Sequence, residues 1–156
     1  MDEYFDMAVA ETVKGIADGM SGPFGATIVR GDEVVAAVGN RQLGEGDPSQ
    51  HAEMVAVREA CKLLGTMDLS DCIMYATCEP CPMCVAVMIW AGIKDCYFSA
   101  TRDDAARYGF GDMHLRRFLA GEDDSVINMV AVAPRADCVD LFDTFHERHP
   151  GLVPMP

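Results

Sequence analysis

Residues 72–91 read CIMYATCEPCPMCVAVMIWA, and this stretch decides the fold around it. Its first six residues form a mostly apolar run of strand length. From about residue 81 to 91 the chain is strongly apolar over a length typical of a helix. Pro82 suits the first helical turn, where its missing N–H costs no hydrogen bond. The stretch therefore predicts a strand followed directly by a helix, with a pair of cysteines where the helix begins.

Helix and strand patterns alternate on both sides of this stretch. A helical period is present over residues 4–18, 51–64 and 137–148, and shorter helical pieces flank a loop at 109–112. Strand patterns are present over residues 23–29, 33–38, 95–100 and 126–132. Together with 72–77 these give five strands alternating with helices, which is typical of a layered α/β fold with a mixed sheet. The 156 residues have the length of one domain, so we expect a single domain over residues 1–156.

The composition disfavours several classes of protein. Hydrophobic residues make up 50% and charged residues 24%, which excludes intrinsic disorder. The 12 Lys and Arg stand against 25 Asp and Glu, and this net charge of −13 disfavours nucleic acid as a partner. The acidic start has no signal-peptide core, and no apolar stretch approaches the ~18 residues of a membrane span. We expect a small-molecule partner, no membrane partner and a cytoplasmic location.

Cysteine usage separates one pair from the rest. The chain has seven cysteines, an odd number, and most of them stand singly in apolar surroundings. This pattern indicates reduced thiols rather than a disulfide framework. Cys81 and Cys84 differ, because their spacing places both sulfurs on one side of a helix start, where unpaired N–H groups favour thiolates.

His51-Ala52-Glu53 opens another predicted helix and completes a candidate zinc site. One imidazole and two thiolates suit tetrahedral zinc, and three protein ligands leave the fourth position for the water of a catalytic site. Glu53, two residues after the histidine, is placed to carry protons. The plainer interpretation, buried cysteines and an exposed glutamate, does not explain the joint pattern of His-x-Glu, 26 intervening residues and Pro-Cys-x-x-Cys. That pattern matches the signature of zinc deaminases.

The chain resembles the cytidine deaminase-like superfamily, in the branch of bacterial guanine deaminases. The resemblance is carried by the segments Gly22–Ala26, Asn40, His51–Met54, Cys78–Cys84, Trp90–Ala91, Asp104–Ala106 and Gly109–Asp112. It implies a three-layer α/β/α fold around a central five-stranded mixed sheet. It also implies one Zn²⁺ per chain, held by His51, Cys81 and Cys84.

The resemblance further implies roles for residues around the metal. Glu53 would shuttle protons, and the base would be contacted by Phe24, Asn40, Ala52 and Asp112. From the residues alone, Phe24 is a core side chain and Asn40 and Asp112 are turn residues. Glu79 is either a neighbour of the metal or a helix-cap charge, and His114 is expected at the surface.

The implied reaction is hydrolytic deamination of an aminated purine, foremost guanine to xanthine and ammonia. Zinc-activated water would attack C2, and Glu53 would move protons to the ring nitrogen and the departing amine. Cytosine, guanosine or a triazine such as ammeline are alternative substrates. The tRNA adenosine deaminases are a further alternative, although they usually carry Val where Phe24 stands and a basic surface that this chain lacks.

The resemblance also implies a homodimer with a swapped C-terminal segment. Guanine deaminases of this kind close the site with an aromatic or acidic group near the C-terminus. This chain ends LVPMP and has no aromatic residue after Phe145. Asp143 is the candidate acidic group, or else a solvated charge on its helix. The predicted helix at 81–91 is apolar nearly all round, which also favours a dimer.

Overall fold

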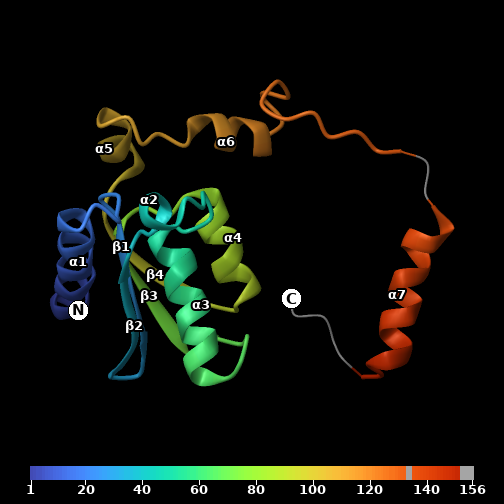
Figure 1. The fold of residues 1–156 in the computed structure, drawn as a ribbon, viewed down its shortest axis with the longest axis horizontal. Coiled ribbons are helices and arrows are strands. Elements are labelled where there is room, and N and C mark those ends of the chain that lie inside the picture. Colours follow the sequence, from blue (N-terminus) through green and yellow to red (C-terminus); the bar gives the residue numbers. More distant parts are fainter. Residues whose placement is uncertain (133–134, 152–156) are drawn as a thin grey trace.

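The computed structural model describes residues 1–132 and 135–151, and its centre is a mixed four-stranded sheet (Figure 1). The strands are β1 (Gly25–Arg30), β2 (Glu33–Gly39), β3 (Cys72–Cys78) and β4 (Asp95–Ala100), in the order β2-β1-β3-β4. β1 pairs antiparallel with β2 and with β3, whereas β3 and β4 are parallel. The predicted hairpin is confirmed, and α4 (Pro82–Trp90) makes the crossover that the parallel pair requires.

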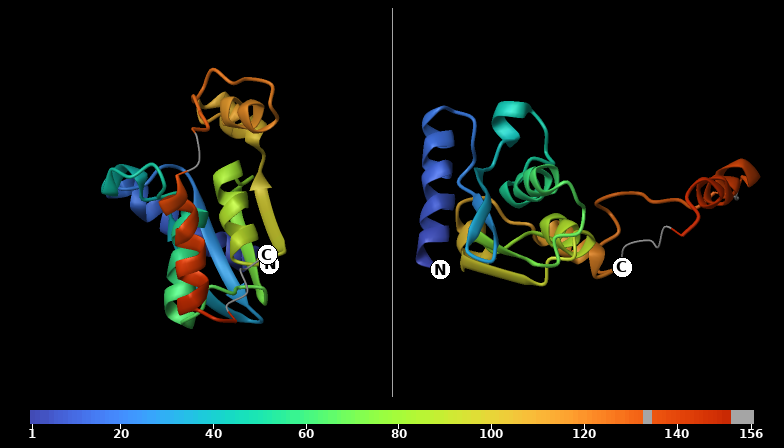
Figure 2. Two further views of the ribbon diagram at one scale, coloured as in Figure 1. Left: turned by 90° about the vertical axis from the view of Figure 1, so that its right-hand side faces the viewer. Right: turned by 90° about the horizontal axis from the view of Figure 1, so that it is seen from below.

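Helices cover both faces of the sheet, which confirms the three layers (Figure 2). α1 (Asp2–Ala17) packs on one face against β1, β2 and β3, while α3 (Ala52–Leu64) and α4 lie on the other. Both faces of β1 are buried: Ile28 points into the core beneath α3, and the Thr27 hydroxyl donates to the Tyr4 carbonyl of α1 at 2.9 Å. α1 can approach β1 closely because residue 25 is a glycine: a Cβ at this position would lie 2.4 Å from the Ala8 carbonyl oxygen.

Short helices lie at the end of the sheet where β2 leads into α2 (Gln42–Glu45) and α3 and β3 leads into α4. α2 lies within the predicted loop 40–50. α5 (Arg102–Arg107) and α6 (Met113–Leu119) are the predicted helical pieces on either side of the 109–112 loop. α5 begins with a capping box, in which the side chains of Thr101 and Asp104 each bond the other's backbone N–H.

The expected fifth strand is wrong. Residues 126–132 are apolar but form no strand, and all of them are exposed. The period of a sequence reports that a segment can be buried, not which edge it pairs with. The chain here leads away from the sheet to α7 (Ala136–Arg148), the predicted last helix, which lies apart from the body (Figure 1). Within the described residues no helix has the length and apolar character needed to cross a bilayer.

Candidate active site

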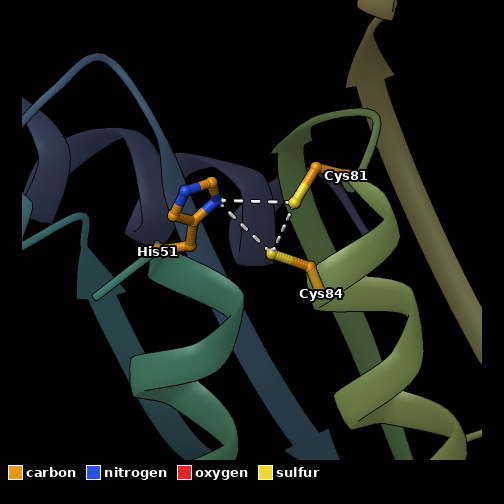
Figure 3. Close-up of side chains that lie close together, drawn as sticks. All are labelled: His51, Cys81 and Cys84. Atoms are coloured by element: carbon orange, nitrogen blue, oxygen red, sulfur yellow. Dashed lines mark hydrogen bonds between the residues drawn. The ribbon is translucent and has the colours of Figure 1, made fainter. Parts of the chain in front are cut away.

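The two predicted motifs meet at the starts of two neighbouring helices (Figure 3). His51 is the N-cap of α3, Cys81 is the N-cap of α4, and Cys84 lies in the first turns of α4. The Nδ1 atom of His51 lies 3.7 Å from Cys81 Sγ and 3.6 Å from Cys84 Sγ. The two sulfurs are 3.6 Å apart. The three donor atoms therefore form a small triangle, one of its corners supplied by α3 and two by α4.

This triangle has the dimensions of a zinc site. Zn–S bonds of about 2.3 Å and Zn–N bonds of about 2.0–2.1 Å at tetrahedral angles place two sulfurs about 3.8 Å apart and sulfur and nitrogen about 3.6 Å apart. The observed separations of 3.6–3.7 Å agree with both values. His51, Cys81 and Cys84 also form a group of potential metal ligands in which all donor atoms lie within 4.8 Å. The donor set therefore fits zinc in both chemistry and size.

The protonation of the two thiols is coupled. A hydrogen bond from the Cys84 thiol, together with one from His51, lowers the pKa of Cys81 to about 4. The hydrogen bond with Cys81 and burial raise the pKa of Cys84. The hydrogen bond with Cys81 also raises the pKa of the His51 imidazole. These shifts favour the thiolate at Cys81, and a metal ion held here would displace the remaining thiol proton of Cys84.

Glu53 lies in the first turn of α3, buried on the wall of a cavity of about 490 Å³. That volume is in the range of small-molecule sites. Burial raises the pKa of the Glu53 carboxyl, because an apolar environment disfavours its charged form. His51 and Cys81 line the same cavity. A buried carboxyl group with a raised pKa therefore lines the same cavity as two of the metal-ligand residues.

The structure brings two of the four expected base-contacting residues to this cavity. Phe24 lines it and packs edge-on against Phe110, with ring centroids 5.3 Å apart. Asp112 lines it from the N-terminus of α6. Glu79 is on the same wall, where its carboxylate accepts from the Arg102 backbone N–H at 3.2 Å.

Asn40 and Ala52 are not among the residues that line the cavity. Ala52 is fully buried and Asn40 is 2% exposed. Asn40 donates to the Gln42 side chain at 2.8 Å and accepts from the Gln42 backbone N–H at 2.9 Å, and Gln42 itself lines the cavity. The contact of Asn40 with a base stays a prediction, and the polar group that the structure presents is Gln42.

Two further residues were not identified from the sequence. His114, expected at the surface, is exposed but belongs to the cavity wall. Arg116 holds Asp112, and the only sequence signal for this contact is their spacing of four residues on a helix. Asp143 lies on α7, which stands apart from the body of the fold in Figure 1. The chain end at 152–156, near which the resemblance implies a closing group, lies outside the described residues.

Comparisons with known proteins agree with this site. A family model described as the cytidine and deoxycytidylate deaminase zinc-binding region matches residues 1–100. The guanine deaminase of Bacillus subtilis (strain 168) is 42% identical over 114 residues, 73% of this chain and 73% of that protein. A tRNA-specific adenosine deaminase of Aquifex aeolicus (strain VF5) is 37% identical over 98 residues, 63% of this chain and 65% of that protein.

A solved structure extends the similarity beyond the matched region. The X-ray structure of guanine deaminase from Bacillus subtilis aligns with a TM-score of 0.88 at 31% identity, over 98% of this chain and 98% of that chain. The family match contains both helix starts that form the triangle of ligands. The chain therefore belongs to the cytidine and deoxycytidylate deaminase family, whose shared element is this zinc-binding region.

Proposed function

We propose that this enzyme deaminates guanine hydrolytically, giving xanthine and ammonia. The observation that carries the proposal is that Asp112 lines the same cavity as Glu53 and the metal-ligand residues His51 and Cys81. Guanine presents its N1–H and 2-amino donors side by side, and an ionised carboxylate offers only acceptors. The similarity to a guanine deaminase over nearly the whole chain supports the same substrate.

We assign the chemistry to the residues of this wall. A zinc ion held by His51, Cys81 and Cys84 would supply a Lewis acid that makes water a nucleophile near neutral pH. Glu53 would accept a proton from that water, protonate the ring nitrogen next to C2, and then protonate the departing amino group. A buried carboxyl with a raised pKa suits this double use, because a general acid–base works best when its pKa lies near the working pH. Phe24 would form one wall of a slot for the flat ring.

An ammonia-release screen tests the proposal with guanine, adenine, cytosine, guanosine, cytidine and a triazine. Guanine should give the highest kcat/KM. Asp112→Asn should reduce kcat/KM for guanine and narrow its advantage over the other rings, because a ring without the donor pair cannot make the hydrogen bonds that guanine makes to this carboxylate. A higher kcat/KM for another ring, or an unchanged preference in Asp112→Asn, contradicts the assignment.

The tRNA adenosine deaminases are the second candidate, favoured by the Aquifex aeolicus relative. A tRNA substrate requires cationic side chains that displace counterions from phosphates. The net charge of −13 opposes this, and the sequence has no run of Lys or Arg longer than the pair at 116–117. Adding a tRNA with adenosine at the wobble position to the screen separates the two functions, since inosine formation would establish the second.

We also propose that the enzyme is a homodimer in which the C-terminal part of one chain covers its partner. Apolar side chains are exposed along 126–132 and on α7, where Phe142 is 70% exposed. In the body, α4 exposes Ile89 and Trp90 and β4 exposes Phe98. When two copies exchange their C-terminal segments, the apolar side chains of 126–132 and α7 of one chain can pack on the exposed apolar side chains of α4 and β4 of the other.

Light scattering at micromolar concentration should give the mass of two chains. Phe142→Asp should shift the mass toward one chain, whereas Leu63→Asp, at an equally apolar and 66% exposed position on α3, should not. A monomeric and fully active wild type contradicts the dimer. We keep the cytoplasmic location as part of the proposal, supported by seven cysteines that are all free thiols.

A further inference from the structure

We infer that Arg116 is a positioning residue that fixes the Asp112 carboxylate relative to the metal-binding turn at Pro80–Cys84. The inference rests on the proposed function, because it gives Asp112 the task of recognising the base. Nothing in the zinc-deaminase signature includes this arginine, which lies on α6, outside both motifs.

Arg116 holds Asp112 at two points. Its Nε donates to both carboxylate oxygens at 3.0 Å, and its Nη2 lies 2.9 Å from Oδ2. The two side chains are 25% and 19% exposed, so the pair is partly shielded from water. A planar guanidinium that grips both oxygens sets the plane of the carboxylate as well as its position. A lysine at this position would supply charge without that orientation.

The same guanidinium reaches the turn that carries the metal ligands. Nη2 donates to the Pro80 carbonyl at 3.3 Å, and Pro80 directly precedes Cys81. Nη2 also lies 3.8 Å from the Glu79 carboxylate. One side chain thus connects the residue proposed to bind the base with the start of α4. Since the base must meet the metal and Asp112 together, this connection sets the separation of the two binding features.

Asp112 keeps the capacity to bind a ligand while it is held. A carboxylate offers about four acceptor sites on its two oxygens, more than one guanidinium occupies. The carboxylate also lies on the cavity wall, whereas Arg116 does not line that cavity. Arg116 therefore acts through Asp112 and need not touch the substrate.

The test compares zinc-loaded Arg116→Gln, Arg116→Lys and Asp112→Asn, with the double variant Asp112→Asn/Arg116→Gln. Arg117→Gln is the matched control, because Arg117 is the next residue of α6 and its ion pairs among the described residues are long, at 3.9 Å from both Glu122 and Asp123. For each protein kcat and KM are measured with guanine and with the best competing ring, together with zinc content and Tm.

Arg116→Gln should lower kcat/KM for guanine about 10–100-fold, the usual effect of removing a group that orients a functional side chain. It should also narrow the preference for guanine over the competing ring. Arg116→Lys should restore only part of the kcat/KM for guanine and part of that preference. Arg117→Gln should stay within about twofold. In the Asp112→Asn background the second substitution should have little further effect, because a residue that acts through Asp112 has nothing left to position.

Four results would overturn the inference. In the first, Arg116→Gln has the same kcat/KM for guanine as Arg117→Gln. In the second, Arg116→Gln lowers kcat/KM by the same factor in the wild-type and Asp112→Asn backgrounds. In the third, Arg116→Gln has a lower zinc content and a lower Tm but the same preference for guanine, which indicates a merely structural role. A wild type that is inactive on guanine overturns the proposed function and this inference with it, whereas the other three results leave the proposed function standing.

Discussion

Glu53→Gln should abolish turnover while leaving the fold and the metal-ligand group intact. Gln has nearly the same shape as Glu, so it fits the buried site, but it cannot carry a proton. The three ligand side chains are unchanged. Burial raises the pKa of Glu53 above its unfolded-state value. Its contribution to the free energy of unfolding is therefore full below the unfolded-state pKa and is lost as the pH rises through the folded-state pKa. Gln does not ionise, and the metal-free variant should melt no lower than metal-free wild type.

The surroundings of Glu53 set the expected size of the effect. General acid–base groups contribute typically about 10²–10⁴-fold, or about 2.7–5.4 kcal/mol of barrier. Glu79 and Asp112 line the same cavity, but the Glu79 carboxylate accepts from the Arg102 backbone and Asp112 is gripped by Arg116. Neither is free to replace Glu53. In the proposed reaction Glu53 acts twice in each turnover, so we expect a loss of at least about 10⁴-fold.

Ammonia release from guanine measures kcat/KM, and metal analysis of the same samples measures zinc per chain. Glu59→Gln is the control, since Glu59 is on the same helix but half-exposed, in an ion pair with Arg41 at 2.6 Å. It should remain within about twofold of wild type. Activity of Glu53→Gln within tenfold of wild type, at equal zinc content, would refute the proton-carrying role.

Two further predictions concern the metal and the packing of α1. Cys84→Ala should lose zinc and have a lower Tm, since metal binding and folding are coupled. Cys138→Ala, on α7 with an exposed side chain, should keep the zinc content and Tm of wild type. Stoichiometric zinc in Cys84→Ala contradicts the ligand assignment. Gly25→Ala should destabilise the fold by about 1–3 kcal/mol or more in denaturant unfolding, because its Cβ would lie 2.4 Å from the Ala8 carbonyl oxygen. Gly22→Ala, with its nearest atom at 3.7 Å, should stay near wild type, and equal stability of the two variants would show that α1 shifts freely.

The helix starts were predictable because their residues act locally. A proline in the first turn, a cysteine pair at three-residue spacing and a His-x-Glu motif each report on one helix end, and the zinc chemistry then requires those ends to meet. The distances of 3.6–3.7 Å confirm that they do. Four of the five predicted strands are also present, since each has neighbours in the sheet close to it in sequence or joined by one crossover.

The remaining features depend on contacts that local patterns do not contain. Residues 126–132 have the composition of a strand, but composition does not supply a partner edge. Asn40 has the side chain expected to bind a base, yet its hydrogen bonds go to Gln42, which the sequence did not single out. The prediction of one domain over residues 1–156 stays a prediction, and α7, apart from the body, is the part of the chain on which it depends.

Glu53, Glu79 and Asp112 line one cavity, and their different surroundings suit them to different roles. A group that carries protons must change its charge during each turnover, and burial, which raises the pKa of Glu53, makes the neutral form accessible. A group that recognises donors must present its acceptor atoms in a fixed place, and the guanidinium of Arg116 holds both oxygens of the Asp112 carboxylate. The motif places Glu53 beside the metal, but it does not distinguish one amino-bearing ring from another. We therefore propose that selectivity comes from the Asp112 carboxylate, which Arg116 connects to the metal-binding turn through its hydrogen bond to the Pro80 carbonyl.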